Sequence, residues 1–123
     1  MKDRKELIKI TKVVLEYMKK LESANIVANL FNIMIITVKK EAKTKQDQMR
    51  RFLEIAYSFK DKENIKQFSG GKKALDSAER FLNDFFKVSK EGSEFVLNNN
   101  LLKDLDIDEL HYVFGWCRRL LKT

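Results

Sequence analysis

Apolar residues recur along this chain at intervals of three and four positions, which is the spacing of one face of an α-helix. The pattern predicts helices over residues 3–22, 25–42, 45–59, 72–88 and 106–122. Few segments alternate apolar and polar residues, the chain has no proline, and it has only four glycines. We therefore expect residues 1–123 to form one all-α domain, a single compact bundle of about five helices.

The predicted helix over residues 25–42 is apolar nearly all round, which indicates burial on several sides. Its longest apolar run, residues 26–38, is interrupted by Asn29 and Asn32. The run is also shorter than the ~20 residues that a membrane-spanning helix needs. We interpret this segment as a buried central helix and expect no membrane partner.

Two of the predicted helices begin at residues suited to capping. Thr44 is a favourable N-cap for the helix over residues 45–59, and Asp47 stands three residues later, as in a capping box. Asp106 and Glu109 repeat this spacing at the start of the last helix. Helical spacing also places five apolar residues on one face of the helix over residues 45–59, and we expect this face to point into the core: Met49, Phe52, Leu53, Ala56 and Phe59.

The last predicted helix has two apolar faces. One consists of Ile107, Leu110, Phe114, Cys117 and Leu121, and the other of Val113, Trp116 and Leu120. A helix in so small a domain should use only one such face for its own core, so we expect the second to contact another protein chain. Alternatively, Trp116 beside Arg119 could act as a platform on which nucleobases stack.

Basic residues are concentrated in the middle of the chain. Lys and Arg number 25 against 18 Asp and Glu, for a formal net charge of +7, which favours an anionic partner, nucleic acid before membrane. Residues 39–51 carry six basic and two acidic side chains at a helix entrance, the arrangement of a phosphate-binding surface. The candidate nucleic-acid contacts are Lys39, Lys40, Lys43, Lys45, Gln48, Arg50, Arg51, Lys72, Lys73, Arg118 and Arg119.

The basic helix also has a purely structural interpretation. Asp47 and Arg51, like Arg50 and Glu54, are four residues apart and can pair along a solvated helix face. Residues 91–109 carry six acidic side chains opposed only by Lys103. This acidic patch either meets the basic patch of another copy or simply favours the N-terminus of the last helix.

Catalytic and metal-binding patterns are missing from the sequence. His111 is the only histidine and Cys117 the only cysteine, so one chain cannot build a His/Cys zinc site, and their spacing places them on different sides of a helix. A calcium loop starting at Asp104 would place Gly115 where glutamate is needed. We therefore predict a non-enzyme with no catalytic residue, metal or cofactor.

The segment 69–73, Ser-Gly-Gly-Lys-Lys, differs from a nucleotide-binding loop because lysines stand at positions 66 and 73, where the motif needs glycine and Ser or Thr. It is either a helix N-terminus that accepts a backbone phosphate or a flexible hinge.

The single cysteine and the amphipathic, charged N-terminus favour a cytoplasmic protein without a signal peptide.

Two stretches resemble a known family. Residues 44–53, Thr-Lys-Gln-Asp-Gln-Met-Arg-Arg-Phe-Leu, and 112–121, Tyr-Val-Phe-Gly-Trp-Cys-Arg-Arg-Leu-Leu, are similar to segments of the small helical subunits of type III CRISPR effector complexes. The resemblance implies a non-catalytic subunit of an antiviral ribonucleoprotein. Copies would stack along the duplex of guide and target RNA and contact its backbone through Lys45, Gln48, Arg50 and Arg51, with Arg118 or Arg119 as further contacts.

These observations give three candidate functions. The first is a non-catalytic RNA-binding subunit that recognises backbone charge and shape. The second is a helical protein–protein interaction module that uses the last helix, with the positive charge serving only solubility. The third is a DNA-binding regulator with residues 45–59 as its recognition helix.

Overall fold

The computed structural model describes residues 3–65 and 71–121, and its mostly helical class agrees with the sequence prediction. The α-helices are α1 (Arg4–Lys19), α2 (Ala24–Glu41), α3 (Lys45–Ser58), α4 (Lys62–Ile65), α5 (Lys72–Arg80) and α6 (Ile107–Leu121). A π-helical turn, η1 (Phe81–Phe86), continues α5, and β1 (Val88–Glu91) pairs with β2 (Glu94–Leu97). Ser69, Gly70 and Lys122, which carried sequence predictions, lie outside the described residues.

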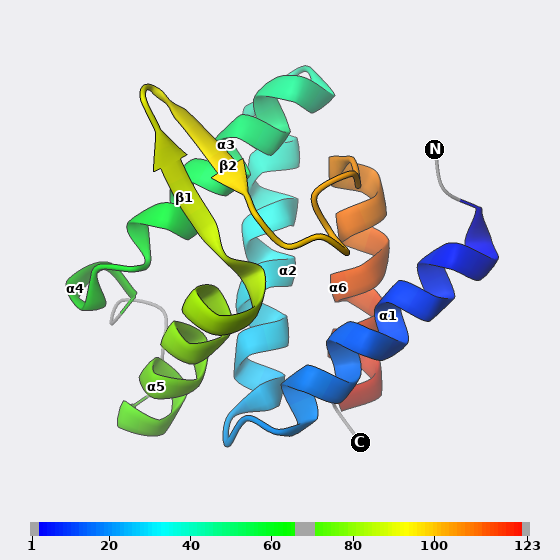
Figure 1. Cartoon of the computed structure of the whole chain (residues 1–123), viewed down its shortest axis with the longest axis vertical. Coiled ribbons are helices and arrows are strands. Elements are labelled where there is room, and N and C mark those ends of the chain that lie inside the picture. Colours follow the sequence, from blue (N-terminus) through cyan, green and yellow to red (C-terminus); the bar gives the residue numbers. More distant parts are fainter. Residues whose placement is uncertain (1–2, 66–70, 122–123) are drawn as a thin grey trace.

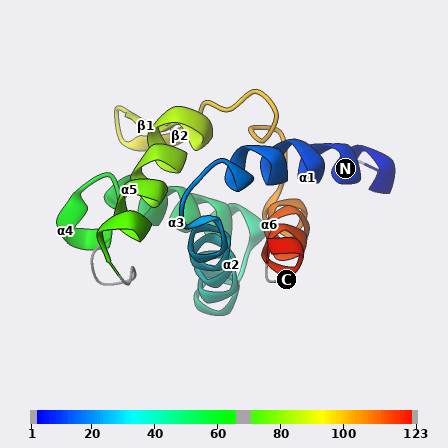
Figure 2. The same ribbon diagram turned by 90° about the horizontal axis from the view of Figure 1, so that it is seen from below.

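Helix α2 lies between the other helices in the view of Figure 1, whereas Figure 2 shows it at one face of the molecule. Helix α6 lies beside it, α1 packs against both, α3 packs against α2, and α5 lies on the other side (Figures 1 and 2). Helix α2 is therefore buried on several sides, as predicted, but not all round, because Ile26 and Ile33 on its outer side are exposed. Among the described residues, no helix combines the length and the apolar character needed to cross a membrane.

The core is built around aromatic rings. Phe31 of α2 lies within 5.0–6.1 Å, centroid to centroid, of Phe52 in α3, Phe81 and Phe86 in η1 and Phe114 in α6. All five rings are fully buried. One ring of α2 therefore joins three other parts of the chain, which fixes the position of α6 relative to α2 and α3.

The predicted helix starts are confirmed by their capping bonds. The backbone N–H of Asp47 donates to Thr44 Oγ1 at 3.1 Å. At α6 the capping box is complete, because the Glu109 N–H donates to Asp106 Oδ1 at 2.8 Å and the Asp106 N–H donates to Glu109 Oε1 at 3.0 Å. Such caps satisfy backbone donors that a helix leaves unpaired, and each stabilises by ~1 kcal/mol.

The antiparallel hairpin of β1 and β2 was not predicted. The helix expected over residues 72–88 ends at Phe86, and Lys87 adopts a left-handed conformation with φ 57°. Glu91 pairs with Glu94 across the two-residue loop of Gly92 and Ser93, and Gly92 has φ +63°. A Gly-Ser pair is a recognised two-residue hairpin signal, so the sequence did contain the information.

Candidate functional site

The predicted basic cluster forms one surface at the end of α2 and the start of α3. We call it the α2–α3 corner and define it by Lys39, Lys40, Lys43, Lys45, Arg50 and Arg51. All of these side chains are exposed except that of Lys39, which is partly buried. The fold places the corner there because α2 ends at Glu41 and α3 begins at Lys45, after a short turn.

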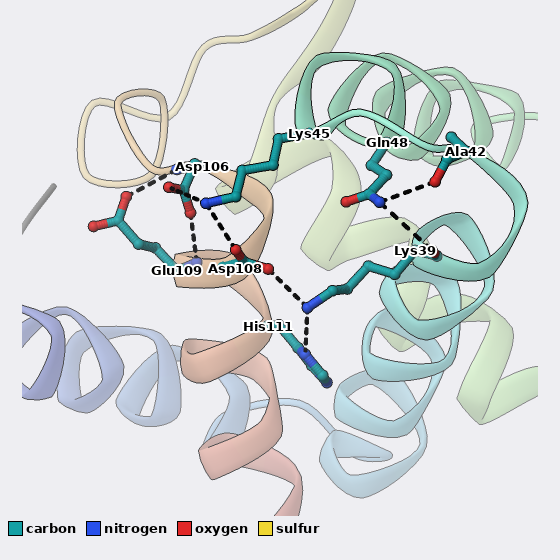
Figure 3. Close-up of polar contacts among 8 residues, drawn as sticks. All are labelled: Lys39, Ala42, Lys45, Gln48, Asp106, Asp108, Glu109 and His111. Atoms are coloured by element: carbon teal, nitrogen blue, oxygen red, sulfur yellow. Dashed lines mark hydrogen bonds and ion pairs between the residues drawn. The ribbon is translucent and has the colours of Figure 1, made fainter.

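Two lysines of the corner already have anionic partners within the chain. Lys39 Nζ lies 2.7 Å from Asp108 Oδ1, and Lys45 Nζ lies 2.9 Å from Asp108 Oδ2 and 3.9 Å from Asp106 Oδ2 (Figure 3). Hydrogen bonds from Lys39 and then Lys45 lower the pKa of Asp108. The bond to Asp108 raises the pKa of Lys45. The acidic start of α6 therefore meets the basic corner of its own chain.

Gln48 requires a correction. It was predicted to contact nucleic acid, but its side chain is buried. Its Nε2 donates to the Ala42 carbonyl at 3.0 Å and reaches the Lys39 carbonyl at 3.5 Å (Figure 3). These carbonyls lie at the C-terminal end of α2, where backbone acceptors lack helical partners. Gln48 therefore ties α3 to the end of α2 and is not part of the exposed contact surface.

The arginines of the corner are exposed but pair differently from the sequence prediction. Arg50 Nη2 lies 3.3 Å from Asp47 Oδ1, and Arg51 Nη2 lies 3.0 Å from Glu41 Oε2. The sequence predicted a pair between Arg50 and Glu54 and another between Asp47 and Arg51, but these are not the pairs that form. Solvent-exposed pairs of this kind contribute only ~0.2–1 kcal/mol, so both guanidinium groups can exchange partners.

Lys40 and Lys43 are the least constrained cations of the corner. Both side chains are exposed, and neither has an ion pair within residues 3–65 and 71–121.

The other predicted nucleic-acid contacts lie elsewhere. Lys72 and Lys73 begin α5, and Arg118 and Arg119 lie near the end of α6, both far from the corner (Figure 1).

Three of these four remote cations, Lys73, Arg118 and Arg119, have local contacts. Lys73 Nζ lies 3.9 Å from Glu22 Oε1. Arg118 Nε donates to Asn29 Oδ1 at 2.9 Å, and the Arg119 guanidinium lies over the Trp116 ring, 5.3 Å from its centroid. The structure therefore unites six of the eleven predicted contact residues in one surface, adds buried Gln48 beneath it, and separates the remaining four.

No protein family, curated protein or solved structure matches this chain. The functional assignment therefore depends on the residues and their geometry.

The predicted outer face of α6 is only partly correct. Trp116 and Leu120 are exposed, at 41% and 49% of their surface, but Val113 is completely buried. The physical reason is that α6 packs against α2 and also against α1, so its buried surface is wider than a single stripe (Figure 2). Val113 belongs to the core and is removed from the predicted partner surface.

The two chemically reactive side chains of α6 do not combine. Cys117 is buried, burial raises its pKa to about 12, and its Sγ lies 3.9 Å from the Thr11 carbonyl. His111 Nδ1 lies 3.5 Å from Lys39 Nζ instead. Among the described residues, no group of three or more His, Cys, Asp or Glu side chains could hold a metal ion.

Sequence reasoning missed the contact between Asp108 and the corner. The signal was present, because residues 104–109 are rich in acid and residues 39–51 are rich in base. Nothing in the local pattern says that these two segments meet in the same chain. Their contact depends on the side-by-side packing of α2 and α6, which brings together residues 69 positions apart.

Proposed function

We propose that this protein is a non-catalytic RNA-binding protein that contacts the RNA backbone through Lys40, Lys43, Arg50 and Arg51 of the α2–α3 corner. The observation that carries the proposal is the exposure of these four cations around one helix junction. Lys40 and Lys43 are available without breaking an ion pair among the described residues. Arg50 and Arg51 would exchange weak, exposed pairs for phosphate.

Lys39 and Lys45 have a different part in this proposal. Asp108 binds both of them, so its negative charge offsets part of theirs, and a phosphate would have to compete with that carboxylate. The choice of RNA over DNA comes from the resemblance of residues 44–53 and 112–121 to small CRISPR effector subunits. The sequence contains no recognised base-reading module, which favours recognition of charge and shape.

The test neutralises the four cations together, as Lys40→Gln, Lys43→Gln, Arg50→Gln and Arg51→Gln. Fluorescence anisotropy of a labelled single-stranded RNA is measured across a salt series. Each phosphate contact on a single strand contributes a slope of about 0.7 in log affinity against log salt, so the variant should lose a slope of about 3.

A matched control removes the same charge elsewhere, as Lys9→Gln, Lys19→Gln, Lys20→Gln and Lys90→Gln, all at exposed positions. The proposal expects the control to keep most of the parent's slope. An equal loss in both variants would mean that only net charge matters. Equal affinity for a DNA strand of the same sequence would remove the preference for RNA.

A further inference from the structure

A shallow groove runs between α1 and α6 on a surface separate from the α2–α3 corner. It has a volume of about 260 Å³ and is lined by Ile8, Thr11, Lys12, Tyr112, Trp116 and Leu120. Six large hydrophobic side chains are exposed among the described residues, and three of them, Ile8, Trp116 and Leu120, lie here. Exposed apolar residues gathered in one hollow are typical of an interaction surface, whereas scattered ones are not.

The edge of the groove is positively charged. Lys12 lines it, and the Arg119 guanidinium lies over the Trp116 ring. Lys5 lies one helical turn before Ile8 on the same side of α1 and is also exposed. None of the six lining residues is acidic.

Two carboxylates that lie one or two helical turns from the groove are already paired. Glu16, one turn beyond Lys12, pairs with Lys19 at 4.0 Å. Asp108, two turns before Trp116 on α6, is held by Lys39 and Lys45. Within residues 3–65 and 71–121, Lys5, Lys12 and Arg119 form no ion pair, so the groove combines an apolar floor with a cationic edge.

We propose that this groove binds an amphipathic helix of a partner protein, with apolar anchors on one face and acidic residues beside them. A groove between two packed helices accepts such a helix through anchors at positions i, i+3, i+4 and i+7. Acidic flanks would complement Lys5, Lys12 and Arg119, which steers the encounter and fixes the orientation.

Two other occupants fit less well. A second copy would bring an identical cationic edge against this one in a symmetric dimer, between chains of net charge +7. A nucleobase would have to stack on Trp116 or Tyr112, but the Arg119 guanidinium already lies over the Trp116 ring, the two rings lie beside each other at 6.3 Å, and Ile8 and Leu120 are aliphatic.

Trp116 is the only tryptophan of the chain, so its fluorescence reports directly on the groove. The probe is a synthetic amphipathic peptide without tryptophan, with leucines on one helical face and glutamates on the other. We expect it to shift Trp116 emission to shorter wavelength in a saturable manner. Peptides of the same composition in scrambled order, or with lysine in place of glutamate, should not.

Substitutions locate the binding. Leu120→Glu and Lys12→Glu should each weaken binding of the fluorescein-labelled peptide about tenfold or more. Ile33→Glu is the matched control, because Ile33 is equally exposed, at 46%, but lies on α2 and does not line the groove. Circular dichroism verifies that each variant is folded.

Several results would overturn the inference. One is the absence of peptide binding, or equal binding of the scrambled peptide. Another is a dimer in sedimentation that Leu120→Glu abolishes, which would assign the groove to a second copy. A third is an RNA-induced shift of Trp116 emission, which would assign it to nucleic acid. The four-cation corner variant should bind the peptide like the parent, so the two proposals can fail separately.

Discussion

The two ends of α6 differ in the kind of side chain that they expose. At its N-terminal end, Asp106 and Glu109 cap the helix, and Asp108 binds two lysines of the α2–α3 corner. At its C-terminal end, Trp116 and Leu120 leave nearly half of their surface in water. The N-terminal end pairs its charged groups within the chain, and the C-terminal end leaves apolar surface exposed outside the core.

This difference shows why net charge is a poor guide to where a protein binds. The sequence places six basic residues at the α2–α3 corner, but Asp108, from the start of α6, binds Lys39 and Lys45. An ion pair cannot offset exposed apolar area, because only burial removes that area from water. Burial stabilises by ~25 cal/mol per Å². The C-terminal end of α6 is therefore the more direct indication of a partner.

The largest predicted effect separates two aromatic residues of α6. Phe114 is fully buried, and its ring stacks on Phe31 at 5.0 Å, whereas Trp116 is 41% exposed. Phe114→Ala should lower the free energy of unfolding by ~3–5 kcal/mol, since it leaves a cavity at the aromatic centre. Trp116→Ala should change it by less than ~1 kcal/mol.

Urea denaturation followed by circular dichroism measures both values. The denaturant slope m serves as the control, since an unchanged slope shows that the unfolding transition still exposes the same surface. If Trp116→Ala destabilises the chain as much as Phe114→Ala does, Trp116 belongs to the core. The contrast between the two ends of α6 would then be lost.

The sequence predicted what depends on local pattern. The helix predicted over residues 3–22 forms as α1, with Ile10, Val14 and Met18 buried, and the caps at Thr44 and Asp106 form as expected. Helical periodicity and capping act over three or four residues, so a single segment contains the necessary information. Such rules place the helices well and their ends within a few residues.

Contacts between distant segments could not be predicted in this way. Val113 was expected on the outside because its helix shows two apolar faces, but α1 and α2 together cover more than one stripe. Gln48 looked like an exposed polar residue, yet it bonds to carbonyls at the end of α2. Both errors arise because a helix pattern does not reveal how many neighbours the helix has.

A second prediction removes the charge that joins the two regions. Asp108→Asn should cost roughly 0.5–1 kcal/mol of stability, because the pairs with Lys39 and Lys45 are partly exposed. The two lysines then become available to an anionic ligand. If RNA binds at the corner, its affinity at low salt should rise, and the salt slope should increase by about 1.4.

Asp104→Asn provides the matched control, since it removes one exposed carboxylate near the start of α6. Anisotropy with the same labelled RNA measures both variants across the salt series. A similar gain in both would show that overall charge, and not the release of the two lysines, raises the affinity. No gain in Asp108→Asn would separate RNA binding from the corner.

The smallest predicted effect tests the corner through pH. Burial, followed by the nearby charge of Lys39, lowers the pKa of His111 below its ordinary value of 6.5. The unfolded chain therefore binds a proton at higher pH than the folded chain, and stability falls as pH decreases below about 6.5. The ring is partly exposed, so the loss between about pH 7.5 and pH 5.5 should be roughly a few tenths of a kcal/mol. Asp108, whose pKa is also lowered, loses its contribution only below its ordinary value of 3.8, outside this window.

Urea titrations of the parent and of His111→Gln at both pH values measure the effect, and the variant should lose less stability than the parent. An equal loss in both would mean that folding does not lower the pKa of His111.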